Sequence, residues 1–130
     1  METTDNNLLI QTWIEYHADT KANSDLFWAW EQVDEAVNKS PEEGWPLILA
    51  LVEAAPNDLI LANVAAGPLE DLIVQHSEQF IGRIEVMARQ DAKFRKALTG
   101  VWCEGDIPNE IYQRIQHYTA TVSDPLCRNA

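Results

Sequence analysis

The chain has 130 residues, 46% of them hydrophobic, and a formal net charge of −12 at pH 7. This length supports one domain with a single core, and the hydrophobic fraction is that of a globular protein rather than of a disordered chain. A negative charge of this size repels nucleic acids and anionic membranes, so the sequence disfavours direct binding to either.

The negative charge is concentrated in the first 79 residues. Two basic side chains stand there against fifteen acidic ones, whereas residues 80–130 carry seven basic and six acidic side chains. A field of this sign attracts basic surfaces and speeds their approach. We therefore expect the partner of this chain to be a basic protein.

Cysteine content and hydropathy favour a cytoplasmic protein. Two cysteines, Cys103 and Cys127, are too few and too distant in sequence to indicate a disulfide framework or a metal motif. The amino terminus is polar and acidic, which is not typical of a secretory signal. No apolar run approaches the roughly 18 residues that a membrane span needs.

Apolar residues at intervals of three and four predict two amino-terminal helices, over about residues 6–18 and 24–38. In the second helix, Trp28 and Trp30 lie about 200° apart around the axis, so both indoles cannot face one core. We expect Trp30 to be buried and Trp28 to lie off the buried stripe. Three further tryptophans are predicted to be core anchors: Trp13, Trp45 and Trp102.

Prolines and glycines mark the predicted breaks in the middle of the chain. Pro46 would cost a helix interior one hydrogen bond, which favours a short turn followed by a helix over about 46–55. Asn57 is suited to cap a central helix that ends at Gly67. We expect Gly67 to have a positive φ or a helix-capping geometry, and Pro68 to start the next helix.

Further helix signals follow in the second half of the chain. Ser77 is expected to open one helix and Asp91 to cap the next, which Gly100 ends. A last helix is predicted over about 108–120, and residues 121–130 are expected to be frayed. The whole pattern predicts one all-α domain, a compact bundle or irregular superhelix of seven or eight short antiparallel helices.

No motif for catalysis, phosphate binding or metal coordination occurs in the sequence. Glu70 and Asp71 form an acidic pair, but Glu70 stands three positions after Gly67, where its carboxylate would cap the new helix. Glu70→Ala should then cost about 1 kcal/mol of stability and abolish no activity. The three histidines stand singly, without a spaced partner. The sequence therefore predicts no catalytic residue, no cofactor and no metal site.

Basic residues gather in one segment of the otherwise acidic chain. They are expected to form a solvated face that pairs with the acidic half. The alternative is an anion site, which the long-range negative field weakens. The segment contains Arg83, Arg89, Lys93, Arg95 and Lys96.

The expected partner-binding surface lies on and just after the second helix. Trp28 is of the residue type most enriched at binding hot spots, and acidic residues stand close to it in the sequence. Folding is expected to join these charges into one negative patch, with the indole inside or beside it. The predicted partner-binding residues are Trp28, Glu31, Asp34, Glu35, Glu42 and Glu43.

Three strings of residues stand out as a family marker within about residues 28–102. They are Trp45-Pro46-Leu47-Ile48, the run Ala65-Ala66-Gly67-Pro68-Leu69-Glu70-Asp71-Leu72-Ile73 with His76, and Phe94 with Leu98, Val101 and Trp102. Together they resemble a bacterial family of small domains of unknown function. The resemblance implies a bacterial, helical, cytosolic protein, and it brings no activity and no catalytic residues.

Two kinds of function are expected from these features. The first is an acidic protein-interaction module, such as a bacterial immunity or inhibitor protein that neutralises a basic partner such as a toxin. The alternative is a helical scaffold or assembly subunit whose acidity keeps it in solution. An enzyme comes third, because no set of residues meets the prerequisites of catalysis.

Overall fold

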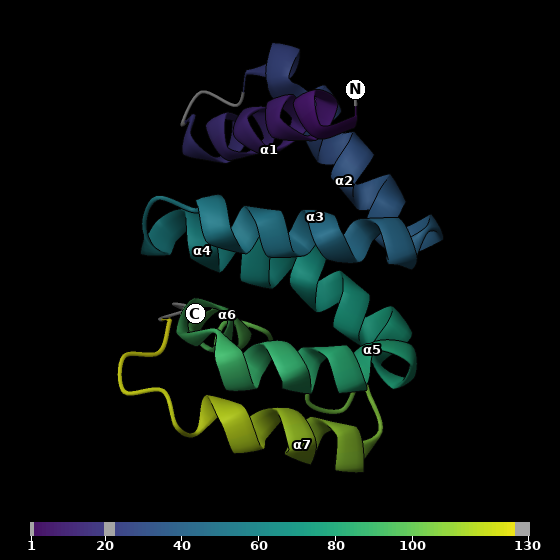
Figure 1. Cartoon of the computed structure of the whole chain (residues 1–130), viewed down its shortest axis with the longest axis vertical. Coiled ribbons are helices and arrows are strands. Elements are labelled where there is room, and N and C mark those ends of the chain that lie inside the picture. Colours follow the sequence, from purple (N-terminus) through teal and green to yellow (C-terminus); the bar gives the residue numbers. More distant parts are fainter. Residues whose placement is uncertain (1, 20–22, 127–130) are drawn as a thin grey trace.

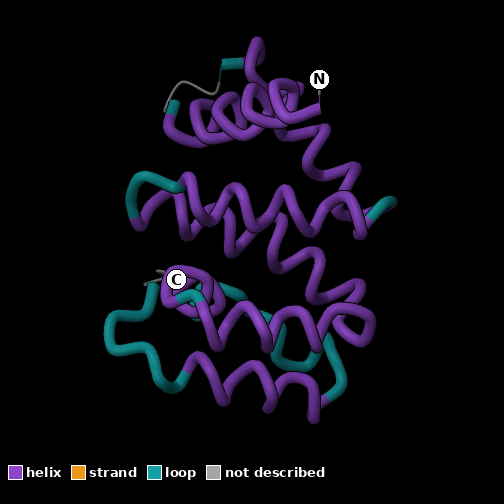
Figure 2. The backbone as a smooth tube through the Cα atoms, in the orientation of Figure 1, coloured by secondary structure: helices purple, strands orange, loops and turns teal. Residues whose placement is uncertain are grey.

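The computed structural model describes residues 2–19 and 23–126, and every regular element in these segments is a helix (Figure 1). The backbone tube in Figure 2 shows only helices and loops along the same path. The all-α prediction is therefore confirmed. The helices are α1 (Glu2–Ala18), α2 (Phe27–Lys39), α3 (Pro41–Ala54), α4 (Asp58–Val64), α5 (Glu70–Gln90), α6 (Ala92–Leu98) and α7 (Asn109–Thr119).

Separate helices are fewer than the sequence predicted. A π turn, Ala65–Leu69, connects α4 to α5 without a break, and a 3₁₀ turn, Ser24–Leu26, is the first turn of α2. Within the described residues the chain forms six separate helices, so the predicted seven or eight is wrong. The first helix also starts at Glu2, ahead of the expected start near residue 6.

The helices are stacked in layers along the long axis of the molecule (Figure 1). α1 and α2 form one end, α3 and α4 form the middle, and α6 and α7 lie at the other end. α5 runs from the middle to that second end and packs on both α6 and α7. Among the described helices, none combines the length and the apolar composition that crossing a membrane requires.

The helix continues through Gly67-Pro68, so the predicted break at this joint is wrong. In the described chain Gly105 is the glycine with positive φ, and the dihedral angles on both sides of the joint are helical. Pro68 has no N–H, and in an ideal α-helix its ring would clash with the carbonyl four residues back. The chain widens to a π turn, in which the Glu70 amide donates to the Ala65 carbonyl. The joint is therefore a wide turn inside one long helix.

Pro46 also fails to break its helix, and the predicted short turn before it is wrong. α3 begins at Pro41, and the Gly44 amide donates to the Ser40 carbonyl (3.0 Å). Pro46 lies in the second turn on the exposed side. One intrahelical bond is lost there, and burial of the apolar face of α3 outweighs that loss.

The break expected at Ser77 is instead a kink within α5. His76 has non-helical angles (φ −135°, ψ 25°), and the helix resumes directly after it. The predicted caps on either side are confirmed: Asn57 accepts from the Ile60 amide (2.9 Å), and Asp91 accepts from two amides at the start of α6. The predicted last helix matches α7 closely.

One continuous group of buried side chains has members in every helix from α1 to α7. Trp45 lies within it, with ring centroids 5.6 Å from Phe80 and 5.8 Å from Phe94. Trp13 is buried as predicted. Trp30 and Trp102 are 37% and 55% exposed, so the prediction that they are core anchors is wrong.

The chain after α7 folds back onto the body of the protein. The Leu126 amide donates to Thr99 Oγ1 (2.8 Å), and the Leu126 side chain is buried. Asp124 forms an ion pair with Lys96 (3.0 Å). Residues 124 and 126 of the end expected to be frayed therefore contact the body of the protein, and residues 127–130 lie outside the described residues.

Candidate functional site

Three of the predicted partner-binding residues share one exposed face of α2. Trp28, Glu31 and Glu35 are three and four residues apart, so their side chains project on the same side of the helix. All three are exposed, with 37% of Trp28 accessible. Glu35 lies 3.7 Å from Lys39, and both side chains are largely in solvent, so this pair adds little stability.

The other predicted residues are distributed differently. Asp34 is half-buried and accepts a hydrogen bond from Asn38 (3.1 Å). Glu42 accepts from both terminal nitrogens of Arg83 (2.8 and 2.9 Å), a bidentate pair that holds the pKa of this carboxyl below its usual value. Glu43 is exposed in the first turn of α3. Asp34 and Glu42 therefore contact neighbours within the protein, as Glu35 does more loosely with Lys39.

Aromatic residues extend the surface at the start of α2. Phe27 stacks on Trp30 at 5.2 Å between centroids, and Tyr16 of α1 contacts Phe27 edge-on at 5.7 Å. Phe27 and Trp30 are each 37% exposed, like Trp28. The acidic face of α2 is thus bordered by an aromatic patch that the sequence-based assignment of Trp30 to the core missed.

Asp34 also faces a small crevice at the π turn. The crevice has a volume of about 60 Å³, which is far below the roughly 300 Å³ or more of ligand pockets. Burial, followed by the nearby charges of Asp34 and Glu70, raises the pKa of Asp71 there. Asp71 of the acidic pair seen in the sequence therefore lies beside a space too small for a substrate. The crevice is lined by Trp13, Trp30, Val33, Asp34, Gly67, Pro68 and Asp71.

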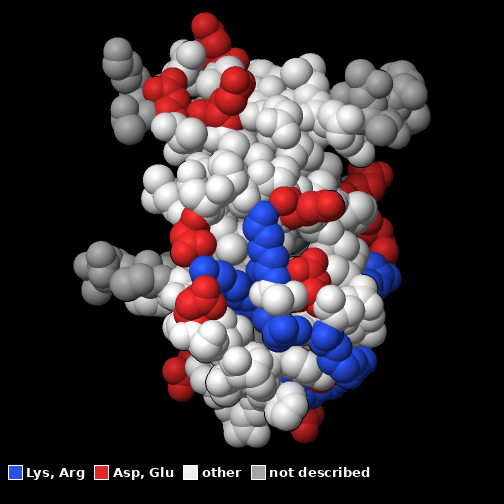
Figure 3. Space-filling model, turned by 60° about the vertical axis from the view of Figure 1, so that its left-hand side comes forward, with Lys and Arg blue, Asp and Glu red and all other residues white. Residues whose placement is uncertain are grey.

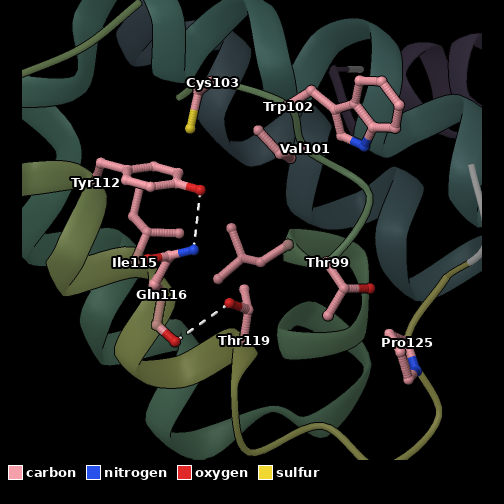
Figure 4. Close-up of a pocket in the computed structure, with 10 residues that line it drawn as sticks. Thr99, Val101, Trp102, Cys103, Tyr112, Ile115, Gln116, Thr119 and Pro125 are labelled. Atoms are coloured by element: carbon pink, nitrogen blue, oxygen red, sulfur yellow. Dashed lines mark hydrogen bonds between the residues drawn. The ribbon is translucent and has the colours of Figure 1, made fainter. Parts of the chain in front are cut away.

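A second surface, which the sequence did not predict, is a groove around the loop between α6 and α7 (Figure 4). Val101, Trp102 and Cys103 of this loop line it together with Tyr112 of α7, and the Trp102 indole is directed away from Tyr112. An apolar arm of about 340 Å³ runs between α6, α7 and Pro125. An acidic arm of about 600 Å³ lies on the other side of Tyr112 and is lined by Glu70, Glu104 and Asp106.

Glu70 fixes the position of the groove wall. Its Oε1 atom accepts from the backbone amide of Trp102 (2.9 Å), 32 residues later in the chain. The predicted capping role of Glu70 is wrong, because the helix runs through this position and has no start there to cap. A turn closes the loop, in which the Asp106 amide donates to the Cys103 carbonyl (3.0 Å) and Gly105 takes φ 86°.

The carboxylates give the acidic arm a negative field. Burial, followed by the charges of Glu70 and Asp106, raises the pKa of the Cys103 thiol to about 11. Burial and the charge of Glu104 raise the pKa of the Tyr112 hydroxyl. Cys103 is therefore a protonated thiol at neutral pH, without the nucleophilicity of a thiolate. The same field stabilises a bound cation.

The basic segment makes contacts within the protein, as Figure 3 shows by a band of Lys and Arg side chains with Asp and Glu beside it. Arg83 and Lys96 form ion pairs, the latter with both Asp58 and Asp124. This confirms the expected pairing for these two residues. Lys93 and Arg95 instead donate to backbone carbonyls at the ends of α3 and α5.

A metal site requires several ligand side chains close together, and histidine is a common ligand. No group of three potential ligands lies close enough together among the described residues. His17 stacks on Trp13 (3.8 Å between centroids), and one ring nitrogen lies 3.0 Å from the Trp13 carbonyl oxygen. The Nε2 atom of His76 is buried and has no hydrogen-bond partner among the described residues. Neither histidine is brought to the α2 face or to the groove.

Glu70→Ala is expected to lower the free energy of unfolding by about 1 kcal/mol, because the Trp102 amide loses its charged acceptor. Denaturant unfolding measures this change. Glu78→Ala is a suitable control, since Glu78 is exposed on the same helix. Equal stability of the two variants would show that the Glu70 contact does not hold the loop.

Comparison with known proteins gives one match. No curated protein and no solved structure is significantly similar to this chain. A family of unknown function, DUF6869, matches residues 16–122, which include α2, the π turn and all the groove residues except Pro125. This agrees with the resemblance carried by the strings around Trp45, Gly67 and Trp102. The chain therefore belongs to DUF6869, a family of unknown function.

Proposed function

We propose that this protein binds a basic protein partner through the exposed face of α2 and thereby neutralises it, as an immunity or inhibitor protein would. The observation that carries this proposal is the exposure of Trp28 on the same face as Glu31 and Glu35. A partner that covers the indole gains affinity from it, and the adjacent carboxylates select a cationic surface.

The packing of α2 beneath this face supports the proposal. α2 packs on α1 and α3, and Ala29, Val33 and Val37 are buried along its opposite side. Asn38 near the end of α2 accepts a hydrogen bond from Gln75 of α5, so the face is held on a rigid element. A preorganised surface loses less conformational entropy when it binds. We place this encounter in the cytoplasm, where the net charge of −12 also steers basic proteins toward the chain.

A charge-reversal experiment tests the proposal. The chain is used to capture partners from its native host, and the captured protein is then purified for kinetic measurements. Glu31→Lys/Glu35→Lys is expected to slow association about tenfold or more, because it replaces attraction by repulsion. The association rate of the unaltered protein should also fall as salt rises past physiological strength.

Glu78→Lys/Glu110→Lys is the matched control, because it changes net charge equally at exposed sites on α5 and α7. This control should slow association far less than the α2 variant. Equal effects of the two variants would contradict a role for the α2 face. Trp28→Ala should mainly speed dissociation, and unchanged dissociation would remove the indole from the site.

A scaffold or assembly role is the second candidate, and exposed apolar side chains away from the α2 charges favour it. Leu8 on α1 and Leu59 on α4 are 59% and 67% exposed. Assembly through such residues is insensitive to salt and to the α2 charge reversal. That pattern of results would support the scaffold in place of the charge-selective binder.

A further inference from the structure

We propose that the groove around Trp102 is a recognition site for an arginine side chain that follows an aliphatic residue in a segment of the basic partner. This inference rests on the proposed function for the nature of the partner, but it assigns a separate site. The α2 face and the groove share no residue. Each can therefore be tested without the other.

The groove has two chemically different arms that meet at the same wall. Val101, Trp102, Cys103 and Tyr112 border both arms. The Tyr112 hydroxyl marks the boundary: it accepts a hydrogen bond from Gln116 (2.9 Å) and lies 3.5 Å from a Glu104 carboxylate oxygen. An occupant that fills both arms needs one apolar group and one polar group in close succession.

The apolar arm suits an aliphatic side chain because its polar lining groups bond to one another. Thr119 donates to the Gln116 carbonyl (3.2 Å), and Gln116 donates to Tyr112 (Figure 4). Thr99 Oγ1 donates to the Lys96 carbonyl and accepts from the Leu126 amide. The space left between these groups is bordered by apolar atoms of Leu98, Val101, Ile115 and Pro125.

The acidic arm suits a cation with a flat face. Glu104 and Asp106 are exposed at its rim, and no ion pair joins either to another described residue. Trp102, which also lines this arm, is 55% exposed. A guanidinium stacks on an indole and donates paired hydrogen bonds to carboxylates, which an ammonium does less well. The carboxylates of Glu70, Glu104 and Asp106 line this space and give it a negative field.

The rigidity of the wall adds to the argument. The Trp102 backbone is tied to Glu70, and Cys103 and Ile107 on either side of the loop tip are buried. The indole is therefore exposed on a fixed loop, which limits the entropy lost when a guanidinium stacks on it. An exposed tryptophan held in this way is typical of a contact residue rather than of a core residue.

A titration of the full chain with defined dipeptides, followed by NMR, tests the inference. The probe is acetyl-leucyl-arginine amide, and the expected result is saturable shifts of the Trp102 indole N–H and of the Val101 and Tyr112 amides. Acetyl-leucyl-citrulline amide is nearly identical in shape but uncharged, and it should bind at least about fivefold more weakly. Acetyl-glycyl-arginine amide should also bind more weakly, since it leaves the apolar arm empty.

The variant Glu104→Gln/Asp106→Asn removes the charge of the rim with little change of shape. It should abolish the preference for arginine over citrulline, whereas Glu110→Gln, which lies outside the groove on α7, should keep it. Equal binding of the arginine and citrulline probes, or shifts confined to α2, would overturn the inference. In that case the α2 charge-reversal result would still decide the proposed function, because the two measurements use different residues.

Discussion

Gly44→Ala is expected to lower the free energy of unfolding by about 2 kcal/mol, because the added methyl group has no space. Gly44 is buried in the first turn of α3, where the chain reverses after α2. A Cβ atom at this position would lie 2.8 Å from the Cα atom of Val37 and 3.0 Å from its backbone nitrogen. Both are main-chain atoms of a packed helix, so α2 and α3 must separate to admit the methyl group.

Two other helical glycines provide the control for this prediction. An added Cβ at Gly67 or Gly82 meets no atom within 4 Å. Alanine is favoured over glycine in helices, so Gly82→Ala should gain about 0.5–1 kcal/mol. Gly67→Ala should gain less, because the ring of Pro68 disfavours a Cβ atom in helical geometry at the preceding residue. Denaturant unfolding of the three variants measures both the expected loss and the expected gain in the free energy of unfolding. If Gly44→Ala is as stable as Gly82→Ala, the close contact of α2 with α3 is absent in solution.

The features that could be predicted from the sequence depend on local interactions. Asn57 and Asp91 cap helices with amides two or three residues away, so the residue type and its place before an apolar run were sufficient. The all-α class followed from the spacing of apolar residues for the same reason. These signals need no knowledge of how distant segments pack.

The helix breaks could not be predicted, because tertiary packing overrides local preference. Pro46 and Pro68 each remove one hydrogen bond, and both stand in helices whose apolar sides lie in the core. Burial of several large side chains along such a helix contributes more than the few kcal/mol that a proline costs. Gly67 therefore keeps helical geometry, and the π turn absorbs the clash.

The two candidate sites also differ in whether they depend on local or on distant contacts along the chain. The face that joins Trp28 to Glu31 and Glu35 lies on one helix, so helical geometry alone places these residues together. The groove depends on a contact between Glu70 and Trp102, whose separation of 32 residues leaves no periodic signal. A weak signal did exist, because Trp102 stands outside any helical stripe, between Gly100 and the polar turn that contains Gly105.

The second large effect on stability is expected for a substitution in the basic segment. Lys93→Met should lower the free energy of unfolding by about 2 kcal/mol, because the Nζ atom donates to the carbonyls of Glu53 (2.9 Å) and Ala55 (2.8 Å). These carbonyls end α3, where the helix dipole also favours a positive charge. Methionine keeps the length and apolar stem of lysine but cannot donate a hydrogen bond. The loss of stability therefore measures the contribution of the hydrogen bonds and the charge.

Lys39→Met is the matched control for this variant. Lys39 pairs with Glu35 at 3.7 Å, with 75% and 68% of the two side chains exposed, and its loss should cost less than about 0.5 kcal/mol. Added phosphate should leave the melting temperature of the unaltered protein unchanged if the basic segment is structural. A large phosphate stabilisation that Lys93→Met abolishes would instead restore the anion site as the explanation, since a ligand stabilises the folded state that binds it.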